Sequence, residues 1–164
     1  VSLALTQRFL SLRSERDLAH QLATHDPLTG ALNRLGGMTI AHRLFAQARQ
    51  SGSPFCAAVL DLDHFKQVND RFGHAVGDAA LKLFADVTRA SLRDGQQLMR
   101  LGGEEFVLLM PGMDRRRALD HVDAVRLSVQ RHGEEIAGAP CRLTVSAGVA
   151  QLNKVHASID AVLN

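Results

Sequence analysis

Apolar residues recur at helical spacing in several segments of the chain. A spacing of three or four residues places such positions on one face of a helix. This spacing predicts helices over residues 1–24, about 32–48, 65–72, 76–87 and 119–129, and the first turns of another over 158–164. Segments that contain Pro and Gly interrupt the first helices, at His25–Gly30 and Ser51–Pro54.

Other patterns predict β-strands. Six consecutive apolar residues, Phe55–Leu60, lie between Pro54 and Asp61 and predict a strand that is buried on both faces. Gln97–Leu101 and Glu105–Met110 predict two strands that are joined by a tight Gly102-Gly103 turn. Leu143–Val149 alternates apolar with polar or small residues, which predicts a half-buried strand. The order of helices and strands predicts one mixed α/β domain.

The composition fits a globular domain and excludes several classes of protein. The 164 residues are 46% apolar and 22% charged, so the chain can bury a sizeable core. The formal charge of +2 and the lack of Trp and Tyr argue against a nucleic-acid partner. Cys56 and Cys141 lie far apart in the sequence, which excludes a disulfide-dense scaffold and suits a reducing compartment.

The apolar pattern of the first 24 residues predicts a helix in front of the domain. No apolar run approaches the roughly 18 residues of a membrane span, and the amino-terminal residues lack a signal-peptide pattern. The first residue is Val rather than Met, so we expect a fragment of a longer protein. Leu5, Leu12 and Ala19 repeat every seven residues, but Arg8 and Glu15 interrupt the apolar seam. Two interpretations stay open from these residues: a surface helix, or the end of a stalk that joins an upstream domain.

Acidic residues stand where two of the predicted strands end or begin. Asp61 and Asp63 end the buried strand, and Glu104 and Glu105 open the hairpin's second strand. Because side chains alternate along a strand, Asp61 and Asp63 can share a face, whereas Glu104 and Glu105 should point apart. Carboxylates with a backbone carbonyl suit Mg²⁺, so the spacing indicates a metal site, with solvated loop acids as the alternative. The eight histidines show no zinc-ligand spacing with the cysteines.

Four segments of the chain carry motifs in a fixed order. Residues 61–78 follow the pattern D-x-D-x-F-K-x-x-N-D-x-x-G-H-x-x-G-D, and Arg100–Phe106 contains G-G-E-E-F. Both segments resemble motifs of the GGDEF family, the diguanylate cyclases, whose hairpin reads G-G-[DE]-E-F. Asp26–Arg34 and Leu143–Val149 resemble two further family segments. The resemblance runs from about residue 23 to the end. It implies an α/β (α+β) fold, with a central mixed sheet of the five-stranded type surrounded by helices, similar to the palm of nucleotide cyclases and polymerases.

The resemblance also implies an activity and its residues. Such cyclases condense two GTP into cyclic di-GMP and release two pyrophosphates. By this resemblance Glu104 and Glu105 are catalytic, and Asp61, Glu104 and the Leu62 carbonyl hold Mg²⁺, with Mn²⁺ as an alternative ion. The residues implied in binding substrate are Asn69 and Asp78 at the guanine, Lys66 and the N–H groups of His64 and Phe65 at the phosphates, and Gly102 and Gly103 beside them. Without the resemblance, helix caps and turn chemistry would explain most of these residues.

The sequence departs from the family in two places. The family's product-inhibition site, R-x-x-D, corresponds here to Arg93 and Gln96, so its acid is replaced by an amide. We therefore predict weak or absent product inhibition. The family continues past Asn164 with a helix and a basic segment that resemble phosphate contacts in other members. We therefore expect the chain as given to bind GTP poorly and to turn it over slowly.

The leading hypothesis is an enzyme domain with a signalling helix in front of it. Residues 1–24 would be the linker helix and residues 25–164 the catalytic domain. The implied partners are GTP, a second copy in an active homodimer, and an upstream sensor or receiver domain, without nucleic-acid or membrane contact. The location would be cytoplasmic, either free or as the cytoplasmic part of a membrane-tethered protein. The alternatives are an inactive GTP-binding or dimerising regulatory domain, and a cyclase that accepts a second nucleotide.

Overall fold

The computed structural model describes residues 2–152 together with 158 and 159. Its elements, in chain order, are α1 (Ser2–Thr24), α2 (Arg34–Ser51), β1 (Phe55–Leu62), α3 (Phe65–Phe72), α4 (His74–Ser91), β2 (Gln97–Gly102), β3 (Glu105–Pro111), α5 (Arg115–His132) and β4 (Val145–Gln151). Every helix and strand predicted within the described residues is confirmed, with shifts of a few residues at the ends. The predicted helix over 158–164 lies largely outside them.

The sheet differs from the predicted one. It has four strands in the order β2-β3-β1-β4, and each neighbouring pair is antiparallel. The predicted α/β (α+β) fold, with a central sheet surrounded by helices, is confirmed. The sheet of the described residues is antiparallel and has four strands, so the prediction of a mixed sheet with five strands is wrong for them. The crossover through α3 and α4 does make β1 and β2 run in the same direction, but β3 lies between them. A parallel contact is present in the isolated bridge between Leu32 and Met99.

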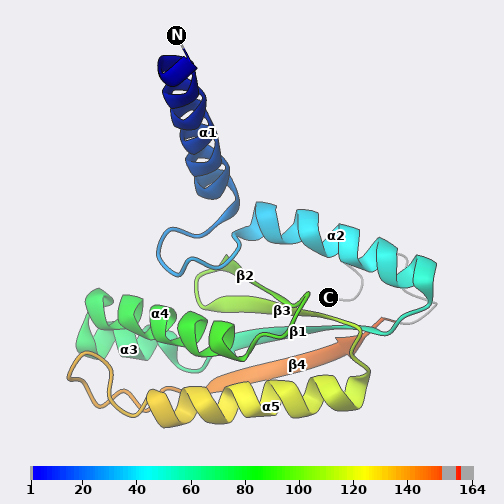
Figure 1. The fold of residues 1–164 in the computed structure, drawn as a ribbon. Coiled ribbons are helices and arrows are strands. Elements are labelled where there is room, and N and C mark those ends of the chain that lie inside the picture. The colour runs from blue at the N-terminus through cyan, green and yellow to red at the C-terminus, as the bar shows by residue number, and fades with distance from the viewer. Residues whose placement is uncertain (1, 153–157, 160–164) are drawn as a thin grey trace.

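The two faces of the sheet carry separate apolar cores. Figure 1 shows α2 over one face and α4 with α5 over the other. Along β1, Cys56, Ala58, Leu60 and Leu62 belong to the core beneath α4 and α5, whereas Phe55 and Ala57 belong to the core beneath α2. The strand is therefore buried on both faces, as its continuous apolar run predicts.

The edge strand β4 is less buried than its alternating sequence predicts. Leu143 and Val145 are buried, but Ala147 is exposed and Val149 is only half-buried. The predicted clean alternation is therefore wrong beyond Val145. Among the described residues β4 pairs with β1 alone, so it lies at the edge of the sheet.

The amino-terminal helix α1 extends away from the rest of the domain (Figure 1). Leu5, Leu10, Leu18 and Leu22 are each more than half exposed on it. The chain then turns over His25–Leu32, and His25 and Leu32 form an isolated antiparallel bridge. Helix α2 follows, and the side chain of its N-cap Asn33 accepts a hydrogen bond from the Gly36 N–H. None of the described helices has the length and hydropathy that a bilayer span requires.

Candidate active site

The carboxyl end of β1 brings together acids from distant parts of the sequence. In the strand register Asp61 lies between Glu105 of β3 and Ser146 of β4. Cross-strand partners project from the same face of a sheet, so these three side chains belong to one face. The Leu62 N–H donates to the Glu104 carbonyl at 3.4 Å, which holds the hairpin turn against the end of β1.

The turn lies one residue later than the sequence predicts. Gly102 pairs with Glu105, and the residues at the tip are Gly103 and Glu104. Gly103 has φ +53°, a left-handed conformation that favours glycine. A register shift between Arg100 and Gly102 causes the difference, because it moves the last residues of β2 relative to β3. The shift places the Glu104 carboxylate at the tip of the hairpin.

The electrostatics of Asp61 favour a bound cation. Burial raises the pKa of Asp61 above its usual value, and the negative charges of Glu104, Glu105 and Asp63 raise it further. Among the described residues, no Lys, Arg or His forms an ion pair with Asp61, Glu104 or Glu105. Negative charge therefore accumulates here without a protein cation to balance it.

The donors present fit a hard, partly hydrated ion. Three or more His, Cys, Asp or Glu side chains do not gather into a ready-made cage anywhere in the described part of the chain. Asp61 and Glu104 instead offer two carboxylates, with the Leu62 carbonyl beside them. Mg²⁺ commonly takes one or two carboxylates and completes its shell with waters and substrate phosphates, so this donor set suits it.

The second acid after β1, Asp63, is anchored by β4. Its carboxylate accepts from the Thr144 hydroxyl at 2.7 Å and from the Ser146 hydroxyl at 2.6 Å, and its N–H donates to the Thr144 carbonyl at 3.0 Å. Burial alone would raise the pKa of Asp63, but these hydroxyl hydrogen bonds outweigh it and hold the pKa below its usual value. Sequence reasoning gave Thr144 and Ser146 no role. Their two-residue spacing was the available signal, because it puts both hydroxyls on one face of a strand.

The start of α3 presents free backbone donors. His64 precedes the helix with φ +56°. None of the hydrogen bonds recorded among the described residues uses the N–H groups of His64, Phe65 or Lys66. The Lys66 side chain is exposed, and it makes no ion pair with another described residue. A helix start with unused N–H groups is suited to an anion.

The corner between α3 and α4 places Asn69 against the first turn of α4, and Asp78 follows that turn. The Gly73 N–H donates to the Asn69 carbonyl at 2.8 Å, and α4 begins at the next residue. A Cβ on Gly77 would lie 2.0 Å from Asn69 Oδ1, so the two residues are in direct contact. Asp78 follows Gly77 and is exposed. An amide and a carboxylate, separated by 9 positions in sequence, therefore border one corner.

The predicted inhibitory residues lie at the opposite end of the sheet. Gln96 precedes β2, whereas Gly102 and Asp61 end their strands at the hairpin. The Gln96 side chain is only 4% exposed, because its Oε1 accepts from the Arg93 N–H at 2.9 Å and its Nε2 donates to Met113 Sδ at 3.4 Å. The amide is therefore held inside the fold, while Arg93 is exposed.

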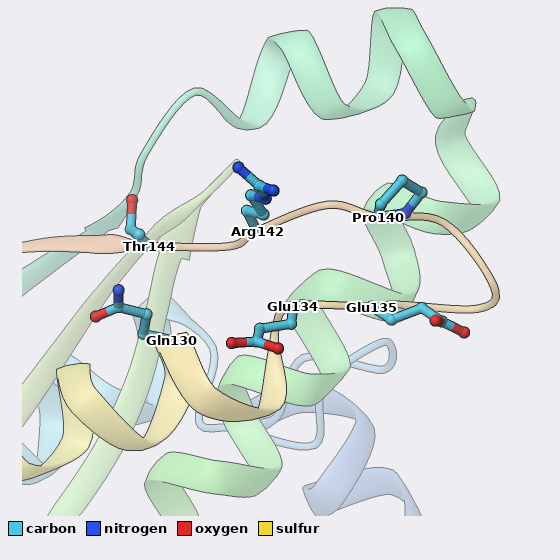
Figure 2. Close-up of a pocket in the computed structure, with 6 residues that line it drawn as sticks. All are labelled: Gln130, Glu134, Glu135, Pro140, Arg142 and Thr144. Atoms are coloured by element: carbon cyan, nitrogen blue, oxygen red, sulfur yellow. The ribbon is translucent and has the colours of Figure 1, made fainter.

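A cavity of about 480 Å³ lies beside Asp63 of the candidate active site, and its lining does not include Asp61, Glu104 or Glu105. Figure 2 shows its lining residues, which come from the end of α5 and the segment before β4: Gln130, Glu134, Glu135, Pro140, Arg142 and Thr144. Thr144 links it to the site through its hydrogen bond to Asp63.

The arrangement matches a known family over most of the chain. Residues 23–164 match the family described as "Diguanylate cyclase, GGDEF domain". The chain belongs to the GGDEF family. Diguanylate cyclase DgcP of Pseudomonas aeruginosa is 35% identical to this GGDEF domain over 153 residues, which are 89% of this chain and 23% of DgcP. Diguanylate cyclase DgcM of Escherichia coli is 38% identical over 148 residues, 90% of this chain and 35% of DgcM. The chain thus spans about a quarter to a third of the length of these relatives.

Solved structures of GGDEF proteins share the fold. The coiled coil and GGDEF domain of DgcB from Caulobacter crescentus, in complex with c-di-GMP, is 28% identical with a TM-score of 0.87 and covers 96% of this chain and 84% of that one. Diguanylate cyclase SiaD from Pseudomonas aeruginosa, in complex with its activator SiaC, is 29% identical with a TM-score of 0.78 and covers 99% of this chain and 65% of that one. GGDEF diguanylate cyclases use a divalent metal, which agrees with the acids at the end of β1.

Proposed function

We propose that this GGDEF domain condenses two GTP molecules into cyclic di-GMP and releases two pyrophosphates. The observation that carries the proposal is the gathering of Asp61, Glu104 and Glu105 at the end of β1, where none of the described residues forms an ion pair with them. The unused N–H groups of His64, Phe65 and Lys66 follow Asp61 by three to five residues in the sequence. A cation site next to an anion site is what a metal-bound triphosphate requires.

In this proposal Asp61, Glu104 and the Leu62 carbonyl hold Mg²⁺, and Mn²⁺ would suit the same oxygens. The ion would screen the triphosphate and lower the pKa of the attacking 3′-hydroxyl. Glu104 and Glu105 are the proposed catalytic acids. Glu105 lies opposite Asp61 in the register and adds to the negative charge there. The glycine backbone at Gly102 and Gly103 leaves room for substrate beside the acids.

The proposed substrate contacts lie along α3 and its corner with α4. The N–H groups of His64 and Phe65 and the ammonium of Lys66 would bind the phosphates. Asn69 and Asp78 would read the guanine edge. A carboxylate accepts from the guanine N1 and N2 hydrogens, and an amide offers both a donor and an acceptor. Adenine lacks that pair of donors, so the contacts favour GTP.

We also propose that the domain acts as a homodimer, with one GTP on each subunit. A subunit that holds one GTP needs a second half-site for a two-GTP product. The four exposed leucines of α1 support a role for this helix in pairing two copies. The relatives are several times longer than this chain, which supports an upstream sensor or receiver domain. The free thiols of Cys56 and Cys141 agree with a cytoplasmic location.

The test is product analysis with a matched pair of variants. Purified protein, at a concentration that favours dimers, is incubated with GTP and Mg²⁺, and the nucleotides are separated by chromatography. Glu104→Ala removes a proposed metal ligand, whereas Glu135→Ala removes an exposed glutamate outside the proposed catalytic machinery. The expected result is cyclic di-GMP from the wild type and from Glu135→Ala, formed slowly as expected for the chain as given, and none from Glu104→Ala. GTP binding without product from any form would instead identify a regulatory domain.

A further inference from the structure

Helix α3 begins without a side-chain cap, although a carboxylate stands directly before it. Its N-cap is His64, whose side chain forms no capping hydrogen bond, and Asp63 precedes His64. An Asp side chain in such a place commonly accepts from the backbone N–H two or three residues later, which here belongs to Phe65 or Lys66. Neither N–H takes part in a hydrogen bond recorded among the described residues.

The same kind of side chain does cap other helices of this chain. At the start of α2, Asn33 accepts from the Gly36 N–H at 2.9 Å. At the start of α5, Asp114 accepts from the Arg117 N–H at 2.9 Å. Each of these caps satisfies one of the N–H groups that a helix leaves unpaired in its first turn. The open start of α3 therefore has a local cause.

Two hydroxyl groups beside α3 hold the Asp63 carboxylate. Thr144 Oγ1 donates to one oxygen at 2.7 Å, and Ser146 Oγ donates to the other at 2.6 Å. The Asp63 N–H also donates to the Thr144 carbonyl at 3.0 Å, so the backbone and the side chain of Asp63 are both tied to residues 144–146. Both carboxylate oxygens thus take their donors from this segment, and neither accepts from an N–H of α3.

We propose that Thr144 and Ser146 are positioning residues, which keep the Asp63 carboxylate away from the start of α3 and so leave its N–H groups free for a phosphate group. Without the two hydroxyls, the carboxylate would turn to the N–H groups of Phe65 and Lys66. It would then occupy the donors that a phosphate needs, and its negative charge would repel the phosphate. This role rests on the phosphate contacts of the proposed function, but not on catalysis.

The first test measures the N–H groups themselves, in protein without metal or nucleotide. Amide hydrogen exchange of Phe65 and Lys66 is followed by ¹H–¹⁵N NMR in the wild type and in Thr144→Val/Ser146→Ala, which lacks both hydroxyls. In the double variant at least one of the two amides should exchange about tenfold more slowly, because the released carboxylate caps it. Thr144→Ser/Ser146→Thr keeps both hydroxyls and should match the wild type.

The second test adds inorganic pyrophosphate to the same metal-free proteins. Pyrophosphate should shift the wild-type signals of Phe65 and Lys66, and Thr144→Val/Ser146→Ala should bind it about tenfold more weakly, because the ligand must displace the carboxylate. The same two substitutions are then made in an Asp63→Ala background. There they should change the affinity by less than about twofold, because no carboxylate is left to cap the helix.

Cooperative thermal unfolding establishes that each variant is folded. Ser146→Ala alone, a change at an exposed residue, takes the place of the double variant if the latter does not fold. Unchanged amide exchange in the folded variants would overturn the assigned role. An equal loss of affinity with and without Asp63 would overturn it too, because a merely structural role predicts that result, and so would wild-type amides that do not respond to pyrophosphate. Pyrophosphate binding at these amides, lost as expected in the double variant, without any cyclic di-GMP from GTP would support the role and count against the cyclase proposal alone.

Discussion

The guanidinium of Arg100 joins the loop after α1 to the turn of the candidate active site. Its Nη1 donates to both carboxylate oxygens of Asp26 at 3.1 Å, although the two residues are 74 positions apart. Its Nε and Nη2 donate to the Gly103 carbonyl at 3.0 and 2.6 Å. One side chain therefore fixes the hairpin that carries Glu104 to the segment through which α1 enters the domain.

Asp26→Asn should unfold more readily than the wild type. The Asp26 and Arg100 side chains are 17% and 15% exposed, and the carboxylate also accepts from the Thr29 N–H and hydroxyl at 2.8 and 2.6 Å. Loss of the charged partner in such a site costs about 2 kcal/mol. Urea unfolding measures this loss. Asp86→Asn is the matched control, because Asp86 forms an ion pair with Arg89 on the surface. Equal destabilisation of the two variants would contradict the assigned role.

The same contact predicts how the stability changes in acid. Burial alone would raise the pKa of Asp26, but hydrogen bonds from Thr29 and the hydrogen bonds and charge of Arg100 outweigh it and hold the pKa below its usual value. The stabilisation is therefore complete above the unfolded pKa and is lost as the pH falls through the folded one. Asp26→Asn should lack this part of the acid dependence.

Asp61→Asn should lower the cyclase activity and raise the stability of the metal-free protein. Because burial and the neighbouring carboxylates raise the pKa of Asp61, its charged form is disfavoured in the folded protein. Stability of the metal-free protein should rise as the pH falls from neutral toward the folded pKa. Asp61→Asn should raise the Tm of the metal-free protein at pH 7 and remove the increase in Tm that Mg²⁺ gives the wild type. Differential scanning calorimetry with Mg²⁺ and with a chelator measures both effects, and an undiminished Mg²⁺ increment in the variant contradicts the metal assignment.

Gly77→Ala should weaken GTP binding without unfolding the domain. Alanine favours a helix interior over glycine by about 1 kcal/mol, so the change by itself is favourable. The new Cβ would lie 2.0 Å from Asn69 Oδ1, which forces the amide out of its place. We expect the KM for GTP to rise about tenfold, because that change in affinity corresponds to the free energy of about one good polar contact. Gly148→Ala is the matched control, since its Cβ would meet nothing within 4 Å.

Cyclic di-GMP should inhibit this domain weakly or not at all. In the family pattern the acid of the inhibitory site stands at position 96, where this chain has the buried amide of Gln96, which bonds Arg93 N–H and Met113 Sδ instead. Initial rates of pyrophosphate release with added product test this, and Arg93→Ala should respond as the wild type does. Strong inhibition at low micromolar product, abolished in Arg93→Ala, would refute the prediction.

The local pattern of the sequence predicted the elements, and the resemblance to a known family implied most of the candidate residues. The apolar run Phe55–Leu60 predicted a strand buried on both faces, because only a strand between two helical layers can hide every side chain. Helical spacing located α2 to α5, and the motif residues Asp61, Asn69, Asp78 and Glu104 all lie in two regions, the end of β1 and the α3–α4 corner. These features depend on neighbours in sequence, which is why the sequence sufficed for them.

Only the tertiary structure decided the features that depend on distant neighbours. The antiparallel order β2-β3-β1-β4 depends on which strands pair, and the turn at Gly103-Glu104 depends on a register shift. The anchoring of Asp63 by Thr144 and Ser146, and the contact of Arg100 with Asp26, join segments that no spacing rule relates. The packing of α5 also decides that the His121 Nε2 is buried without a hydrogen-bond partner among the described residues, because burial is a property of the fold rather than of the residue.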